Sequence, residues 1–386
     1  MKTLATYYEV LGVAPSADTE TLRRAYRRLA REHHPDVSRD PGSHERMARI
    51  NEAFETLINT DKRVEYDAAL AGGTLEIEDK APTYEPLQVK LAARLKGHAT
   101  PIYALTFAPD TGELISSAFD NEILWWNMAT GEYRRRAKLD SGVVSTLRAF
   151  PEGRLAAAGA AENLISYWHL NDNHVDSWRM NHEDWVCAVA ISPDGRHVAM
   201  GAVQHSLTIA DGYTGEERLK KYEHSDSVTA LAWSADSKVL ATGSSDTSIK
   251  LWSAATGAIL QTLHSVRGTI TALAFSNDGA SLAAASVDLS VRIFDLRTGK
   301  LSKVLFGHEK PIESLVFHPN NWLLASGSRD GSVGLWNAAK GLGHVRLEAS
   351  SRPITTVGFS PDGALLAAGG QDKLVRLWTV AEKDRT

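Results

Sequence analysis

Hydrophobic residues in the first part of the chain follow the spacing of an α-helix. Leu22, Tyr26 and Leu29 recur three or four positions apart, which predicts an amphipathic helix over residues 18–33. The same spacing predicts a second helix through Met47, Ile50, Phe54 and Leu57. Pro35 has no backbone N–H and disfavours the α conformation in the residue before it, so the first helix must end there. The pattern therefore predicts a helical hairpin with residues 34–36 in its loop.

From residue 87 onward the pattern changes to short apolar strands that repeat every 42 residues. The positions that end the seven repeats are Trp126, Trp168, Ala210, Trp252, Phe294, Trp336 and Trp378. An acidic residue or a glutamine stands six positions before each of them, and several repeats carry histidine at a fixed earlier position. A period of 40 to 45 residues with a terminal tryptophan resembles the blades of WD-repeat proteins. This resemblance implies a seven-bladed β-propeller.

The two ends of the repeat region are expected to meet in one blade. Only eight residues follow Trp378, too few for the outer strand of the seventh blade. Leu95 is in register with Leu263 and Leu305, which occupy outer-strand positions. Residues 88–95 are therefore expected to supply the missing strand, which removes exposed sheet edges from the ring.

These patterns predict a multidomain chain in which a small all-α domain precedes an all-β propeller. The expected divisions are a helical domain at 1–70, a linker rich in glycine, proline and acidic residues at 71–86, and the propeller at 87–386. Closure through residues 88–95 places the helical domain at the rim of the ring, and we expect it beside blades one and seven.

Composition narrows the classes of function. The 386 residues have 43% hydrophobic side chains, which is ample for a sizeable core. No apolar run approaches the ~20 residues of a membrane helix, and the first residues do not resemble a secretory signal. Cys187 is the only cysteine, so an internal disulfide or multi-cysteine zinc module is excluded and a cytoplasmic location is expected. The net charge of −5 has the wrong sign for a general nucleic-acid binder.

The helical segment resembles the J domain, the module that docks on DnaK-type (heat-shock 70 kDa) chaperones. The resemblance covers roughly residues 5–70 and rests on four motifs in this frame: YYEVLGV at 7–13, AYR at 25–27, HPD at 34–36 and KRVEYD at 62–67. It implies that His34, Pro35 and Asp36 contact the chaperone.

One face of the first long helix is strongly basic. Residues 20–32 contain five arginines and two glutamates, and the arginines are expected opposite Leu22, Tyr26 and Leu29. A run of charge is often only a solvated helix face. Guanidinium groups, however, bind carboxylates in a bidentate manner, and the resemblance implies that three of them dock on the chaperone. These three are Arg23, Arg27 and Arg28.

Histidine, serine or threonine, aspartate and tryptophan recur together in several repeats. A catalytic triad would occur once, so repetition at a fixed spacing favours a structural role. The WD-repeat resemblance implies that these residues form buried hydrogen-bond networks within the blades. The predicted network residues are His98, Asp120, Trp126, His224, Asp246, Trp252, His308, Asp330, Trp336, Asp372 and Trp378.

Three large aromatic residues stand at positions that open onto one face of a propeller. Tyr103, Phe119 and Trp185, here called the aromatic patch, are candidates for binding a client or partner. Ordinary packing against neighbouring loops is the alternative. His169, His174 and His182 lie close in sequence, but their spacings fit no common ligand pattern, no cysteine assists, and no metal is expected.

We expect a co-chaperone of the third J-protein class, because no Gly/Phe-rich or cysteine-rich segment follows residue 70. Its J domain would stimulate the ATPase of a DnaK-type chaperone, and its propeller would bind a specific client. Neither a nucleotide-binding loop nor a nucleophile motif is evident, so we expect no enzymatic activity and no cofactor. The alternative is a scaffold subunit that uses the propeller for assembly and the J fold as a docking surface.

Overall fold

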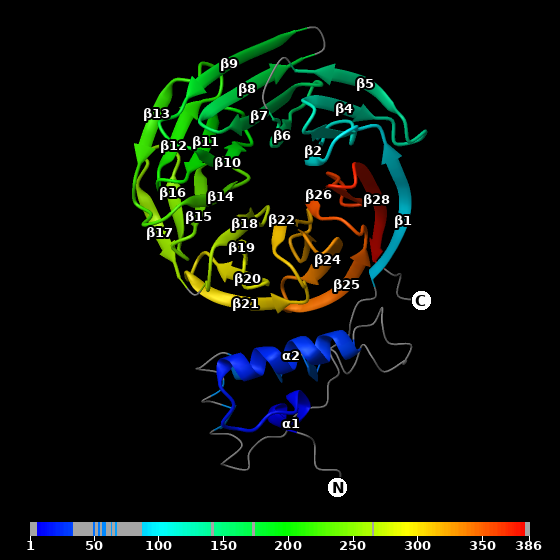
Figure 1. Ribbon diagram of the computed structural model, residues 1–386, viewed down its shortest axis with the longest axis vertical. Coiled ribbons are helices and arrows are strands. Elements are labelled where there is room, and N and C mark those ends of the chain that lie inside the picture. The colour runs from blue at the N-terminus through cyan, green and yellow to red at the C-terminus, as the bar shows by residue number, and fades with distance from the viewer. Residues whose placement is uncertain are drawn as a thin grey trace.

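The computed structural model of the protein describes residues 6–33, 49–50, 53–54, 56–58, 63, 66–67, 87–139, 143–171, 174–264 and 266–382. A small helical part precedes a ring of seven four-stranded sheets (Figure 1). The prediction of an all-α domain followed by a seven-bladed all-β propeller is confirmed. Within the described residues, no helix is both long and apolar enough to cross a membrane.

The helical part contains α1 (Tyr7–Leu11) and α2 (Thr19–His33). Reciprocal hydrogen bonds begin α1: the Glu9 N–H donates to Thr6 Oγ1 at 3.3 Å, and the Thr6 N–H donates to Glu9 Oε2 at 2.7 Å. Gly12 ends α1 in the left-handed conformation, at φ 64°. Asp18 precedes α2 and accepts a hydrogen bond of 2.8 Å from the Thr21 N–H.

A single apolar cluster forms the core of this helical part. Its buried members are Tyr8, Leu11, Ala17, Leu22, Tyr26, Leu29, Ile50, Ala53, Phe54, Leu57, Tyr66 and Phe306. Phe306 is far from the others in sequence and belongs to the ring of sheets. The core of the helical part therefore continues onto the surface of the propeller.

The ring is built from antiparallel sheets, and in blades one to six the strands follow one another in chain order from the centre outward (Figure 1). Blade one has β2 (Ile102–Phe107), β3 (Leu114–Ala118), β4 (Glu122–Trp126) and β5 (Tyr133–Lys138). Blade two has β6 (Thr146–Ala149), β7 (Leu155–Ala161), β8 (Leu164–Leu170) and β9 (Val175–Asn181). Blade three has β10 (Val186–Ile191), β11 (His197–Ala202), β12 (Leu207–Asp211) and β13 (Glu217–Lys221). Blade four has β14 (Val228–Trp233), β15 (Val239–Ser244), β16 (Ile249–Ser253) and β17 (Ile259–Leu263).

The remaining three blades repeat this order. Blade five has β18 (Ile270–Phe275), β19 (Ser281–Ser286), β20 (Ser290–Asp295) and β21 (Lys300–Phe306). Blade six has β22 (Ile312–Phe317), β23 (Leu323–Ser328), β24 (Ser332–Asn337) and β25 (Leu342–Glu348). Blade seven has β26 (Ile354–Phe359), β27 (Leu365–Gly370) and β28 (Leu374–Glu382), with β1 (Leu87–Lys96) as its outer strand.

Blade seven closes the ring by joining both ends of the repeat region. β1 pairs antiparallel with β28, and Leu95 lies opposite Val375. Leu95 is only 1% exposed, whereas Leu91 of the same strand is 38% exposed. The pairing gives β28 an outer neighbour, so blade seven has four strands like the other blades.

The blades pack against one another through small residues on their second strands. Ala283, Ala284 and Ala285 of β19 are fully buried, as strands covered on both faces must be. At Gly327 of β23, an added Cβ would lie 2.8 Å from Ile354 Cγ2 of blade seven, so only glycine permits this approach. The Trp126, Trp168 and Trp252 side chains fill the wider space further out.

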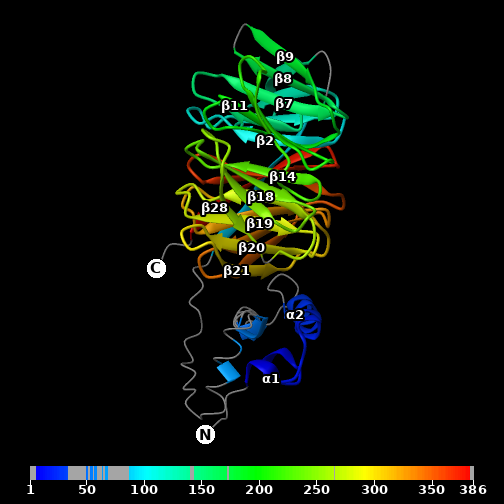
Figure 2. The ribbon, with the colours of Figure 1, turned by 90° about the vertical axis from the view of Figure 1, so that its left-hand side faces the viewer.

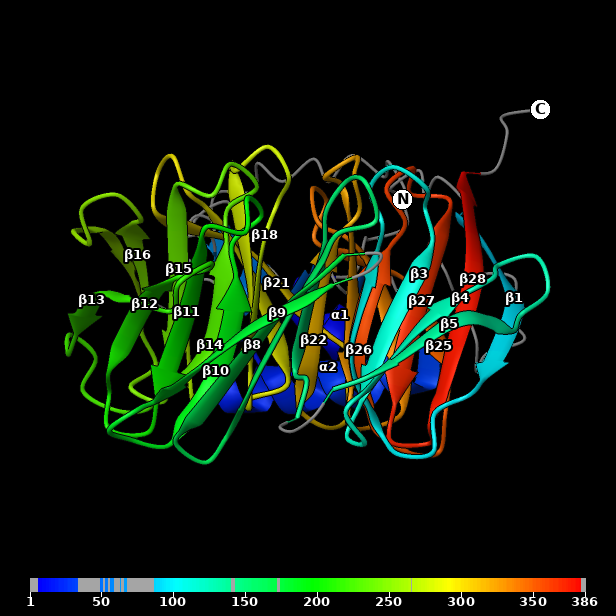
Figure 3. The ribbon, with the colours of Figure 1, turned by 90° about the horizontal axis from the view of Figure 1, so that it is seen from above.

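The helical part lies outside the rim of the ring (Figure 2). Figure 3 views the ring from its edge and shows α1 and α2 behind the blades. The expectation of a place beside blades one and seven is wrong, because α2 contacts β21 of blade five. The aromatic side chain of Phe306 supplies an apolar contact at this point of the rim, and chain order alone does not reveal it.

Candidate functional site

The basic helix α2 carries the three arginines that sequence analysis selected. Arg27 and Arg28 are exposed, and the Arg27 guanidinium lies 3.7 Å from Glu20 Oε1. Both partners of this ion pair are widely exposed, so it contributes little to stability. His34, Pro35 and Asp36 lie outside the described residues, directly after the last residue of α2.

Tyr26 lies at the border between the helical core and the propeller. Its ring stacks on Phe54 with centroids 4.3 Å apart and meets Phe306 edge-on at 5.7 Å. Its hydroxyl donates a hydrogen bond of 3.4 Å to the backbone carbonyl of Phe306. Tyr26 is 5% exposed and Phe306 is 8% exposed, so the contact excludes water from both rings.

Arg23 is one turn before Tyr26 and also faces blade five. The prediction that the arginines stand opposite Tyr26 therefore fails for Arg23, since side chains three positions apart share a helix face. Its Nε atom is buried and has no hydrogen-bond partner. Burial lowers the pKa of Arg23, and the positive charge of Arg267 lowers it further. The guanidinium is thus held partly out of water beside a like charge.

Asp288, the acid of blade five whose charge acts on Arg23, is already paired with an arginine of β20. Asp288 accepts a hydrogen bond of 2.7 Å from Arg292, whose side chain is 4% exposed. Burial opposes ionisation of Asp288, but the hydrogen bonds and charge of Arg292 lower its pKa overall. Arg23 therefore shares the negative charge of Asp288 with Arg292, which is hydrogen-bonded to it.

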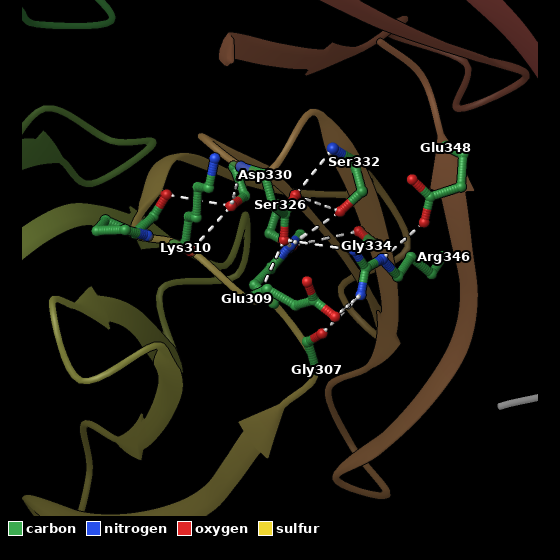
Figure 4. A network of polar contacts seen from close by, with 12 residues as sticks. Gly307, Glu309, Lys310, Ser326, Asp330, Ser332, Gly334, Arg346 and Glu348 are labelled. Carbon is green, nitrogen blue, oxygen red and sulfur yellow. Dashed lines mark hydrogen bonds and ion pairs between the residues drawn. The ribbon is translucent and has the colours of Figure 1, made fainter. Parts of the chain in front are cut away.

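Blade six contains a complete buried network. His308 Nδ1 lies 3.0 Å from Asp330 Oδ2, and His308 Nε2 lies 2.7 Å from Ser326 Oγ. The Trp336 indole N–H donates to the same Ser326 oxygen at 2.8 Å. Figure 4 shows Ser326, Asp330 and Ser332 together, with the Ser332 hydroxyl donating to Asp330 at 2.6 Å. Burial raises the pKa of Asp330, but hydrogen bonds from His308 and Ser332 outweigh this and lower it.

Blade four repeats this arrangement. His224 Nδ1 lies 2.9 Å from Asp246 Oδ2 and its Nε2 lies 2.7 Å from Thr242 Oγ1. The Trp252 indole N–H donates to the Thr242 oxygen at 2.9 Å. Every polar atom of the histidine ring therefore has a partner, as buried polar groups require. The side chains are enclosed and repeated in two blades, which is a structural arrangement and not a nucleophilic site.

Blade one departs from the expected network. His98 Nε2 and the Trp126 indole N–H both lie 2.8 Å from Ser116 Oγ. His98 Nδ1 and Asp120 Oδ2, however, are both buried without a hydrogen-bond partner. In blades four and six a serine follows two residues after the acid and donates to it, but blade one has Glu122 there. Glu122 has no hydroxyl to donate and pairs with Arg136 instead.

Blades five and seven have Val266 and Ser350 at the histidine position, and in both an arginine pairs with the acid of the repeat. In blade seven, Asp372 accepts hydrogen bonds from Ser350 at 2.8 Å and from Arg376 at 2.5 Å. Trp378 is buried but belongs to an apolar cluster. We call the acidic residue six positions before the last residue of a repeat its lattice acid. Arg292 and Arg376 were not predicted from the sequence, although both stand four positions after the lattice acid. That shared offset was the available signal.

Phe306, which joins blade five to the helical part, was not among the residues predicted from the sequence. Its equivalents at the end of other outer strands are mostly polar, namely Lys96, Lys138, His264 and Glu348. Tyr222 of blade three is also aromatic at this position but is exposed, so an aromatic residue here does not by itself identify the contact.

The aromatic patch lies on the surface of blades one and three. Phe119 and Trp185 are 55% and 59% exposed, and Tyr103 is 38% exposed. The rings of Tyr103 and Phe119 are in contact, with centroids 6.1 Å apart. Trp185 lies in another blade and adjoins Val203, whose N–H donates to the Trp185 carbonyl. Tyr103 and Phe119 thus form one exposed pair in blade one, and Trp185 is an exposed aromatic side chain of blade three.

The described residues contain no group of three or more His, Cys, Asp or Glu side chains able to hold a metal ion. His174 instead lies 2.7 Å from Asp176 on the exposed surface of β9.

Two family models match the chain. The DnaJ domain model matches residues 6–67. The model described as "WD domain, G-beta repeat" matches six segments that together cover more than half of the chain. These segments are 89–127, 176–211, 216–253, 257–295, 299–337 and 342–379. Most of blade two lies outside them.

Curated relatives resemble the J domain. A protein named "Chaperone protein DnaJ" from Trichodesmium erythraeum (strain IMS101) is 52% identical over 71 residues, or 17% of this chain and 19% of that protein. Its namesake from Thermosynechococcus vestitus (strain NIES-2133 / IAM M-273 / BP-1) is 54% identical over 61 residues, or 16% of each chain. The match therefore spans less than one fifth of the length of these relatives.

The seven-bladed ring agrees with the match to six WD repeats. The helical part, in which a capped α1 and a basic α2 share one core, agrees with the DnaJ match. The chain belongs to the WD-repeat family, and it carries a DnaJ domain in front of its seven-bladed propeller.

Proposed function

We propose that this protein is a co-chaperone without enzymatic activity of its own. Its J domain recruits a DnaK-type chaperone and stimulates ATP hydrolysis there, while the propeller holds a specific client protein or complex. The observation that carries this proposal is the basic face of α2, which leads directly into His34, Pro35 and Asp36 within a DnaJ domain. We place the protein in the cytoplasm, with no cofactor and no binding of nucleic acid or membrane.

The proposed docking chemistry is electrostatic. Arg23, Arg27 and Arg28 would donate charge-assisted hydrogen bonds to carboxylates of the chaperone, and Asp36 would accept from a donor at the centre of the interface. Arg27 and Arg28 are exposed on α2, which supports an encounter through these two residues.

Single-turnover ATP hydrolysis by a DnaK-type chaperone tests this function. The full chain should accelerate hydrolysis, and Asp36→Asn should abolish the acceleration because an amide cannot supply the same charge. Arg196→Glu in blade three is a surface-charge control and should behave like the native chain. Failure of the native chain to stimulate at any concentration would refute the co-chaperone proposal.

For the client we propose the aromatic patch as an anchor, since exposed aromatic side chains are common centres of protein interfaces. Trp185→Ala should reduce retention of the proteins that purify with the native chain. Tyr213→Ala is a matched control, because Tyr213 is also an exposed aromatic, at 58%. Equal retention by both variants would remove Trp185 from the proposed surface.

The contact between Tyr26 and Phe306 favours one second candidate, a scaffold in which the J fold is a fixed docking surface. A stoichiometric partner that survives native purification in ATP would support the scaffold. Association that ATP disrupts would support the co-chaperone.

A further inference from the structure

The contact between α2 and β21 uses part of the surface that the proposed function assigns to the chaperone. Three aromatic rings form it: Phe306 meets Phe54 edge-on at 5.0 Å and Tyr26 at 5.7 Å. Val304, also on β21, packs partly buried against the same cluster. We call this set of residues, together with Arg23, the α2–β21 contact.

The α2–β21 contact covers the part of the basic face that carries Arg23 and leaves the part with Arg27 and Arg28 exposed. Arg23 is half-buried and its Nε atom is enclosed, whereas Arg24, Arg27 and Arg28 are exposed. A chaperone can therefore meet Arg27 and Arg28 while Arg23 is still covered. Full engagement of Arg23 requires the two parts to separate.

The charges at the contact oppose its closure. Arg23 faces Arg267 and Arg292. Two acids favour its charge: Asp288, which is bound to Arg292, and Glu20 of α2, which pairs with Arg27. Apolar burial holds the surfaces together, and like charge weakens them. An acidic partner would give Arg23 the carboxylate that blade five does not offer. The two surfaces belong to one chain, so even a weak contact forms at a high effective concentration.

We propose that blade five is an intramolecular competitor of the chaperone, and that the α2–β21 contact holds the J domain in a closed, less active state. This inference rests on the proposed co-chaperone function and adds its regulation. The chaperone opens the contact by differential binding, because it binds the J domain more tightly when Arg23 is released than when Arg23 is covered.

Two full-chain variants should move activity in opposite directions. Phe306→Ala removes the aromatic contact, and we expect the concentration needed for half-maximal ATPase stimulation to fall about threefold or more. Arg267→Glu gives Arg23 an acidic neighbour, and we expect that concentration to rise about threefold. Arg267 is an exposed side chain, so this variant should fold even if Phe306→Ala does not.

Matched controls come from blade three. Tyr222 occupies the position equivalent to Phe306 and is 60% exposed, so Tyr222→Ala should leave stimulation unchanged. Arg196→Glu is the corresponding control for reversal of surface charge. A change in these controls as large as in the blade-five variants would overturn the proposal.

A measurement without chaperone separates this inference from the proposed function. Hydroxyl-radical footprinting reports side-chain exposure, and Tyr26 oxidation should rise several-fold in Phe306→Ala. Unchanged oxidation in a folded Phe306→Ala variant would overturn the closed state, whatever the ATPase shows. Increased oxidation with stimulation equal to that of the native chain would show that the contact exists but does not compete. Stimulation by none of the proteins would instead refute the co-chaperone function on which the inference depends.

Discussion

At the scale of single residues, the side chain two positions after the lattice acid decides how a blade holds its histidine. Ser248 and Ser332 donate hydrogen bonds to Asp246 and Asp330, which in turn contact the Nδ1 atoms of their histidines. In blade one, Glu122 cannot do so, and the Nδ1 atom of its histidine has no partner. One substitution therefore separates a complete network from an incomplete one.

This difference predicts unequal effects from the same mutation in two blades. Asp330→Asn should lower the free energy of unfolding by ~2 kcal/mol or more, because His308 and Ser332 lose a buried charged acceptor. Asp120→Asn should change it by no more than ~0.5 kcal/mol, since Asp120 makes no bond to His98. Urea unfolding of the two variants provides the comparison, and equal losses would contradict this account.

A second prediction concerns acid stability. Burial lowers the pKa of His98 from 6.5 to about 4. The folded state thus binds its proton less readily than the unfolded chain, so stability is full above about pH 6.5 and is lost as the pH falls through 4. The loss from this group is on the order of 3 kcal/mol.

His98→Gln should therefore lose less stability on acidification than the native chain. Urea midpoints at pH 7 and pH 4.5 measure the two losses, and all other titrating groups are shared. Parallel pH profiles for the two proteins would show that His98 does not titrate in this window.

At the scale of elements, β1 contributes more to the stability of the closed ring than its position at the rim indicates. It is the outer strand of blade seven, and its residue Leu95 is buried in a cluster shared by blades one and seven. Loss of this packing weakens the one place where the first and last strands of the repeat region meet.

Leu95→Ala should lower the free energy of unfolding by about 2–5 kcal/mol, as large-to-small changes in a core do. Leu91→Ala in the same strand should cost less than ~1 kcal/mol, because Leu91 is 38% exposed. Denaturant unfolding monitored by tryptophan fluorescence can test both. A similar cost for the two would mean that β1 is held by backbone pairing alone.

The repeat period was enough to predict the seven blades, because each blade must place the same core residues at the same phase. The repeat period could not predict which blades have a complete hydrogen-bond network around their histidine. That depends on the residue in the turn two positions after the acid, which in blade one is Glu122 and not a serine. The contact of Tyr26 with Phe306 was also beyond reach. These residues are about 280 positions apart, and no periodicity links a helix to an outer strand.

At the scale of the whole molecule, the J domain and the propeller share an interface in which apolar attraction and charge repulsion act against each other. Arg23, Arg267 and Arg292 carry the same charge, and Tyr26 and Phe306 supply the attraction. The balance depends on the solvent, because salt weakens the charge repulsion and strengthens the apolar attraction.

Higher salt should therefore close the α2–β21 contact. Between 0.05 and 0.5 M NaCl we expect Tyr26 oxidation in the native chain to fall about twofold, because the Debye length shortens from roughly 14 Å to 4 Å. Arg267→Ser should show a smaller fall. An increase in Tyr26 oxidation with salt would indicate that net charge attraction, and not repulsion, acts at this interface.

The pairing of β1 with β28 also has a consequence for synthesis on the ribosome. Leu95 is made about 280 residues before Val375, its partner, which at 5–20 residues per second is a delay of roughly 14 to 56 s. Throughout most of that interval Phe306 has not been made either. The newly made J domain then has no Phe306 to contact, while β1, which follows it in the chain, still lacks its partner strand β28. A protein that restrains its own J domain once the ring is closed leaves it unrestrained while the ring is being built.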